Sequence, residues 1–519
     1  MHHSRAFRLF ALCLLAGVAL ACFLTSSGPP EPPAKTASER SLYHADPEHL
    51  WNRLHEALFV RVGPDGRTYG RDRLEPLLWV GSKHLLEEKS HQRAVALLEE
   101  FLKNNGEKLV EDPLKRAVLQ RDLWLVFNWL EGEHGKHFYE PKLKPEQVRA
   151  ARDRLRRPLA AVIRRLALAP GQIKHLPDNY AAAVASGAFP NKFDPEHPDK
   201  PYLPADLFAP DGPWVCVGRT DGPVAPEHLR DTGTNKFTNS AFLVFLRLPD
   251  GRAAGLDYLK RLRAYDQPLR VEAKGAGNRT EKYLPNPKLP QFPAGTEVAL
   301  VRHALLIDAA HAPVASPLTE SVQLRVYREV PGMTARNVWD AVDASNNPAA
   351  DKRVRAWQSF HEFQRSRPRL FGGKAGGLRA IDPDERDFPT PFFQWIRDEF
   401  ENPDYRSPRP PDRPFAERSR GLVKQDCLRC HSLPGVASFN SHFNYRRGPG
   451  ERRRRPRVLV IGDARIRGRR GGREVERGAP ALGRAAKALG GVTSRRCRAF
   501  TGSEPANQVL HLSPRRSGG

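Results

Sequence analysis

The chain has 519 residues, 39% of them hydrophobic and 28% charged, which predicts soluble globular structure in two or three domains and excludes a fully disordered chain. Its formal net charge is +25, but residues 446–519 alone hold 20 Lys or Arg against 5 Asp or Glu. The charge is therefore mainly a property of the tail, and it does not indicate that the body of the protein binds nucleic acid.

Residues 1–25 predict an export signal. An apolar run follows two arginines and ends in small residues suited to cleavage, at Ala19-Leu20-Ala21. The segment resembles a bacterial lipoprotein signal, which implies that Cys22 carries the lipid. A cleaved secretion signal and an uncleaved membrane anchor are the alternatives. All three place the body of the protein outside the cytoplasm, in the periplasm or cell envelope.

A Pro-rich linker at residues 26–45 leads to a predicted helical domain at residues 46–170. Asp46-Pro47 is a suitable helix start, and apolar residues follow it at helical spacing. Two amphipathic stretches, Ala94–Leu102 and Lys115–Leu130, predict a helical hairpin. No repeat of 34 residues recurs, so a solenoid is not predicted.

Residues 200–345 predict a mixed α/β domain with a mainly antiparallel sheet. Short apolar or alternating runs bounded by turn residues predict its strands, which are Trp214–Val217, Phe242–Leu248, Val298–Ile307 and Ser321–Val330. Leu256–Arg263 predicts a helix packed on them, and Pro268–Pro293 predicts a basic loop.

Residues 350–445 predict a mostly helical segment, which makes the whole chain a multidomain α+β protein. Val354–Phe363 predicts an aromatic amphipathic helix, and Phe392–Phe400 a second short one. The stretch Ala416–His431 predicts a third helix, which carries the main chemical motif.

The motif is Cys427-Leu428-Arg429-Cys430-His431. Covalent haem attachment needs two thiols for the two porphyrin vinyl groups and an imidazole for the iron, and residues three and four apart share one face of a helix. Gly421–Gly435 resembles the haem-binding helix and following turn of bacterial cytochrome c domains. The whole chain also resembles large exported bacterial proteins of unknown activity that end in such a segment. We therefore expect one haem c, held by Cys427 and Cys430, with His431 as the proximal iron ligand.

Two other uses of a Cys-x-x-Cys pair compete with haem attachment. A zinc site would need a second cysteine pair, whereas Cys216 and Cys497 each stand alone. A thioredoxin-type redox pair would need a βαβ context upstream. The isolated cysteines also exclude a disulfide framework.

The second axial ligand of the iron decides the chemistry. Cytochrome c domains usually supply a methionine some tens of residues after the motif, and this chain has none there. The candidates are Met333, which would require docking of the middle domain, His442, and His361 on the predicted aromatic helix. The sequence does not choose among them.

The tail, residues 446–519, is rich in Arg and Gly and contains Phe500 as its sole aromatic residue. Such a composition predicts a disordered segment. A nucleic-acid arm is one alternative. A shift of reading frame is another, and would explain why no methionine follows the motif.

These features predict a haem protein that transfers single electrons in the cell envelope. Its partners would be an unidentified redox protein and the membrane, reached through the N-terminal anchor or a lipid, and no catalytic residue is assigned. A peroxidase-like or sensing haem site with an open iron position is the first alternative. A non-enzymatic envelope lipoprotein acting as an interaction module is the second. A nucleic-acid-binding protein ranks last, because the leader exports the chain.

Overall fold

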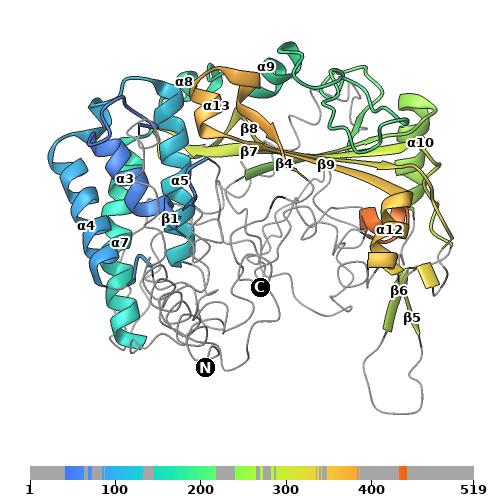
Figure 1. Ribbon diagram of the computed structural model, residues 1–519, viewed down its shortest axis with the longest axis horizontal. Coiled ribbons are helices and arrows are strands. Elements are labelled where there is room, and N and C mark those ends of the chain that lie inside the picture. Colours follow the sequence, from blue (N-terminus) through green and yellow to red (C-terminus); the bar gives the residue numbers. More distant parts are fainter. Residues whose placement is uncertain are drawn as a thin grey trace, which may run out of the picture.

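The computed structural model describes residues 41–62, 68–72, 84–86, 88–131, 145–217, 240–264, 269–272, 282–285, 288–332, 334, 336–337, 340–341, 348–382, 385 and 432–440. The predicted leader (1–25), the helices expected at Phe392–Phe400 and Ala416–His431, and the tail (446–519) lie outside these residues. The described elements form a layer of helices at one end of an antiparallel sheet, with short helices near its faces and edges (Figure 1).

The helical layer consists of α3 Leu50–Phe59, α4 Glu88–Lys103, α5 Pro113–Glu131 and α7 Pro145–Arg165. In α3, Trp51, Leu54 and Leu58 are fully buried at the spacing that predicted this helix. The helices expected at Ala94–Leu102 and Lys115–Leu130 are present as α4 and α5, but the expected hairpin is wrong. Each of them packs mainly on α7, whose buried stripe is wide enough to face both.

The sheet is six-stranded and antiparallel, in the order β10-β9-β8-β7-β4-β3, which confirms the predicted mixed architecture. Its strands are β3 Val215–Cys216, β4 Ser240–Arg247, β7 Thr296–Ile307, β8 Pro313–Tyr327, β9 Gln358–Arg365 and β10 Leu378–Ala380. A separate pair of short strands, β1 Arg61–Val62 and β2 Thr68–Tyr69, follows α3.

The predicted helix Val354–Phe363 is wrong beyond Trp357. There α12, Pro348–Trp357, ends and the chain continues directly as β9. In β9, alternate residues His361 and Phe363 pair with Leu324 and Val322 of β8. Pairing with a distant strand therefore overrides the local aromatic pattern.

The predicted loop Pro268–Pro293 contains a hairpin. Its strands are β5 Leu269–Glu272 and β6 Lys282–Pro285, paired antiparallel (Figure 1). Pro285 is the last residue of β6, and Pro290 and Pro293 follow the hairpin, so neither strand has a proline in its interior.

Apolar layers cover both faces of the sheet. The α9 face lies against α9, Asn179–Ala185, and the loop after it, and includes Cys216, Phe245, Val322, Leu324 and Phe363. The α10 face lies against α10, Gly251–Arg263, and includes Val215, Val244, Leu246, Val298 and Tyr327. Because strand residues alternate between faces, neighbours such as Val215 and Cys216 point in opposite directions.

The remaining helices are short. They are α8 Pro170–Lys174, α13 Arg367–Phe371, α17 Val436–Asn440 and the 3₁₀ turns Gly106–Lys108 and Lys374–Gly377. At the sheet end nearest the helical layer, Leu305 and Ile307 of β7 join the same apolar core as α5 and α7.

Candidate functional site

Most of the predicted site residues lie outside the described part of the chain. They are Cys22, Met333, Cys427, Cys430, His431 and His442. The chain beside two of them is described, since Ser432 follows His431 directly and Met333 stands between Gly332 and Thr334. The structure therefore describes the segments that adjoin the motif and Met333, and not those residues themselves.

Residues 432–440, here called the docked segment, are held by polar contacts to the sheet and to two chain segments outside its strands. Hydrogen bonds run from Ser432 Oγ to the Ala341 carbonyl (2.7 Å), from Val436 N to Gln291 Oε1 (2.7 Å) and from Tyr327 Oη to Ser438 Oγ (3.2 Å). Ser432 and Ser438 are buried, so the two hydrogen bonds of these side chains are made away from bulk water and their loss would be costly.

Apolar contacts hold the same segment. Val436 is buried in the core of the α10 face, beside Tyr327. Leu433 packs against a small cluster formed by Ala341, Val354 and Trp357. The segment after the predicted haem motif is thus attached both to the sheet and to α12.

Gly435 is a residue that this docking requires. Its φ of +52° lies in the left-handed region, where glycine is favoured. A Cβ at this position would also collide with the side chains of Gln291 and Val330. The backbone at Gly435 therefore lies directly against the side chains of Gln291 and Val330.

The connection between β8 and α12, residues 328–347, lies beside the docked segment. Glu329 N donates to the Trp357 carbonyl at 3.0 Å. Arg353 donates two hydrogen bonds to the carboxylate of Asp340, from Nε to Oδ2 at 2.7 Å and from Nη2 to Oδ1 at 2.6 Å. Glu329 and Asp340 are therefore both held against α12.

His361 is buried in β9 on the α9 face, with 1% of its surface exposed. Its ring lies 5.5 Å from that of Tyr202 and 6.4 Å from that of Phe193. The docked segment lies on the α10 face, where Tyr327 contacts it. His361 and the docked segment are thus on opposite sides of the sheet.

Cys216 is held in a disulfide, contrary to the prediction that it stands alone. Its partner is one of the other five cysteines of the chain, all of which lie outside the described residues. Nothing in the local spacing could have indicated this bond, because disulfide pairing depends on how distant segments meet.

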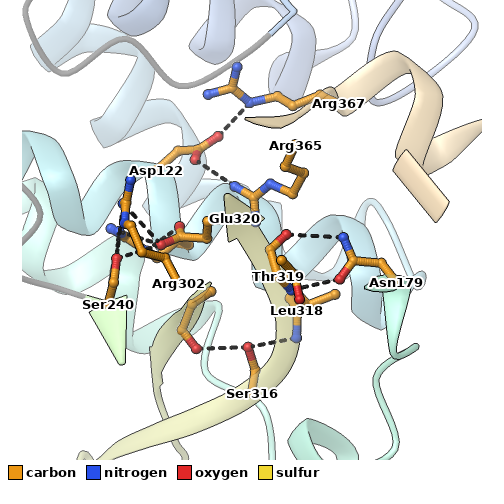
Figure 2. Close-up of polar contacts among 12 residues, drawn as sticks. Asp122, Asn179, Ser240, Arg302, Ser316, Leu318, Thr319, Glu320, Arg365 and Arg367 are labelled. Carbon is orange, nitrogen blue, oxygen red and sulfur yellow. Dashed lines mark hydrogen bonds and ion pairs between the residues drawn. The ribbon is translucent and has the colours of Figure 1, made fainter. Parts of the chain in front are cut away.

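A network of buried charges joins the helical layer to the sheet, and sequence reasoning missed it. Figure 2 shows Asp122 of α5 between Arg365 and Arg367. Its carboxylate lies 2.7 Å from Arg367 Nε and 3.5 Å from Arg365 Nη2. The available signal was a charged pair, Arg121-Asp122, inside an otherwise apolar stretch of the helix.

Glu320 of β8 is the second acidic centre of this network (Figure 2). It lies 2.8 Å from Arg121 Nε and 3.4 Å from Arg302 Nη2, and it accepts a hydrogen bond from Ser240 Oγ at 2.6 Å. Burial alone would raise the pKa of Glu320, but these guanidinium groups outweigh burial and lower its pKa to about 2. Glu320 is therefore ionised at neutral pH, and its contacts with Arg121 of α5 bind the helical layer to the sheet.

An exposed group, Asp194, Glu196 and His197, brings three potential metal-ligand atoms together in the loop after α9. His197 Nδ1 lies 2.9 Å from Asp194 Oδ2. This contact accounts for the arrangement without a metal, because exposed acidic groups are common without a bound ion.

Among the described helices, none combines the length and hydropathy required to cross a bilayer. Comparison of the chain with protein-family models, with curated proteins and with solved structures found no match. What the protein does must therefore be inferred from its own residues.

Proposed function

We propose that this is an exported c-type haem protein that transfers single electrons in the cell envelope. The observation that carries the proposal is the run Cys427–His431, which supplies two thiols and an imidazole in the order that attachment and iron ligation require. Cys427 and Cys430 would hold the porphyrin, and His431 would bind the iron. When bound, haem c supplies one reversible one-electron centre.

The docked segment supports this proposal. Because His431 is bonded to Ser432, the contacts of the segment with Ala341, Gln291 and Tyr327 would fix the C-terminal end of the motif relative to the sheet. A site supported by packed, hydrogen-bonded neighbours holds its ligands in a fixed geometry, as a prosthetic group needs.

The disulfide of Cys216 supports export, since disulfides persist mainly in oxidising compartments. It also sets a requirement, because Cys427 and Cys430 must both be thiols when haem arrives. The side chain of Cys216 lies on the α9 face, whereas the docked segment lies on the α10 face.

The test is a haem stain of the denatured full-length protein, expressed with a c-type maturation system and paired with a pyridine haemochrome spectrum. We expect one haem per chain to survive denaturation. Replacing both motif cysteines (Cys427→Ala with Cys430→Ala) should abolish the stain, and the matched variant Cys497→Ala should retain it.

Absence of haem from protein that is exported and folded would overturn the proposal. Folding is checked by circular dichroism, and the state of the motif thiols by peptide mapping under non-reducing conditions. A disulfide from Cys216 to Cys427 or Cys430 in the mature protein would likewise contradict it. The chain would then be better explained as an envelope interaction protein.

A further inference from the structure

Arg365 of β9 is buried in the charge network with one long contact to a carboxylate. Its side chain is 3% exposed, and its Nη2 lies 3.5 Å from Asp122 Oδ1, which is longer than an ordinary hydrogen bond. Among the described residues, Arg365 Nη1 has no hydrogen-bond partner. Figure 2 shows this guanidinium group beside both acidic centres, Asp122 and Glu320. A buried guanidinium group with such contacts is costly, because it carries a full charge and five N–H donors.

Arg367, in the same network, is better compensated. Its Nε lies 2.7 Å from Asp122 Oδ2, and its Nη1 donates to the Gly70 carbonyl at 3.2 Å. Burial acts to lower the pKa of Arg367, but Asp122 outweighs burial and raises that pKa. Burial also lowers the pKa of Arg365, and there Asp122 and Glu320 do not cancel the effect. Arg365 is therefore the less compensated cation of the two.

Arg121 of α5 offers further donors in the same region. Its Nε lies 2.8 Å from Glu320 Oε1, and its Nη2 donates to Ser240 Oγ at 3.2 Å. Its Nη1 has no hydrogen-bond partner in the described part of the chain, although the side chain is 0% exposed. Arg121 and Arg365 both act electrostatically on Glu320, and repulsion from Arg121 adds to burial in lowering the pKa of Arg365. Two cations that repel each other thus share one dry region.

The other carboxylates near the network compensate other arginines. Glu362 acts electrostatically on Arg302, and Asp72 forms an ion pair with Arg379 at 3.1 Å. Within the described ranges, Asp122 is the sole carboxylate that forms an ion pair with Arg365. The remaining donors of Arg365 and Arg121 therefore suit an anion from solution.

We propose that Arg365 and Arg121 bind one small monovalent anion, of the size and charge of chloride, where β9 meets α5. Guanidinium groups form short, charge-assisted hydrogen bonds with anions. The cost of moving an ion into a dry interior rises with its charge, and Asp122 and Glu320 repel further negative charge. A monovalent anion is therefore favoured over phosphate or sulfate.

The bound anion offsets the repulsion between Arg121 and Arg365 and so strengthens the junction of the helical layer with the sheet. It is a structural ligand of the folded chain. This inference does not depend on the proposed haem attachment, because the residues that carry it lie in α5, β8 and β9.

The first experiment is urea denaturation of the full-length protein at constant ionic strength, with sodium chloride replacing sodium gluconate, whose anion is too large for a dry site. One chloride that binds the folded chain alone raises the equilibrium constant for folding about tenfold for each tenfold rise in chloride concentration above the dissociation constant. The urea midpoint should rise accordingly. An equilibrium constant that does not respond to chloride would overturn the proposal.

Arg365→Gln should remove this dependence on chloride, and it should differ from the parent more in chloride than in gluconate. An equal difference in the two salts would assign Arg365 a merely structural role and contradict the proposal. The matched control is Arg261→Gln, which removes an exposed guanidinium group paired with Asp257 on α10. It should keep the parent's dependence. Chloride that binds elsewhere on the basic chain affects all three proteins alike.

A second measurement needs no variant, and it tests the proposal even if Arg365→Gln fails to fold. Bromide replaces chloride in crystals of the full-length protein, and its anomalous scattering locates the ion. Bromide should lie within hydrogen-bond distance of Arg365 Nη1. Water at this position, with bromide confined to exposed arginines, would overturn the proposal and leave haem attachment unaffected.

Discussion

Arg367 and Asp122 form an ion pair that is buried on both sides, with 2.7 Å between Arg367 Nε and Asp122 Oδ2 and side chains that are 1% and 0% exposed. The two residues stand 245 positions apart and belong to α13 and α5. The pair therefore fastens the helical layer to the part of the chain that follows β9. Removing Asp122 would leave the buried guanidinium groups of Arg365 and Arg367 without this carboxylate.

Asp122→Ala should lower the free energy of unfolding by about 3–5 kcal/mol, because two buried guanidinium groups lose their carboxylate. Urea denaturation followed by circular dichroism measures the change. The matched control is Asp257→Ala, whose ion pair with Arg261 is 64% and 58% exposed. An exposed pair is screened by water, so this variant should unfold at nearly the parent's urea concentration. Equal losses in the two variants would contradict the assigned role of burial.

Glu320 should make the fold sensitive to acid. Burial acts to raise its pKa, but Arg121 and Arg302 lower that pKa from 4.5 to about 2. Folding thus favours the ionised form. The stability contributed by this carboxylate is complete above about pH 4.5 and is lost as the pH falls toward 2, on the order of 3 kcal/mol in all.

The measurement is a series of urea denaturations of the parent and of Glu320→Gln between pH 7 and pH 2. The variant should be less stable at pH 7, and the difference should narrow between pH 4.5 and pH 2, because Glu320 becomes protonated in the unfolded parent while it stays ionised in the folded parent. Other carboxyl groups titrate in both proteins and cancel in the difference. A difference that stays constant across this window would show that Glu320 is not the group responsible.

Gly435→Ala should release the docked segment. The new Cβ would collide with Gln291 and Val330 in addition to straining the left-handed backbone. We expect amides in residues 432–438 to lose protection in hydrogen exchange by at least tenfold, with the sheet unaffected.

Gly187→Ala is the matched control, because Gly187 has a φ of +66° and open space where a Cβ would lie. It should introduce backbone strain alone, about 1–2 kcal/mol, and leave residues 432–438 protected. Unchanged protection in Gly435→Ala would mean that the close approach at Gly435 does not hold the segment in place.

His431→Ala should keep the covalent link through Cys427 and Cys430 but remove the proposed proximal ligand of the iron. The haem stain should persist while the absorption spectrum changes, and added imidazole should restore part of the original spectrum. A spectrum identical to that of the parent would exclude His431 as the ligand.

Local patterns in the sequence were sufficient for much of the fold. The buried stripe of α3 and the apolar runs of β4, β7 and β8 are properties of short windows, and each predicted its element. The motif Cys427–His431 is equally local, because its chemistry depends on spacing within a single helical turn. Haem attachment could therefore be predicted from the motif alone, without information on the residues that surround it in the fold.

Tertiary structure decided what depends on distant partners. His361 lies in a strand because β8 pairs with it, and Cys216 is bonded to a cysteine that its own neighbourhood does not reveal. The ion pair of Asp122 with Arg367 and the contact of Gly435 with Val330 join segments that no periodic pattern connects. Such contacts form only when the register of the sheet and the packing of both its faces are set, and a short stretch of sequence does not contain that information.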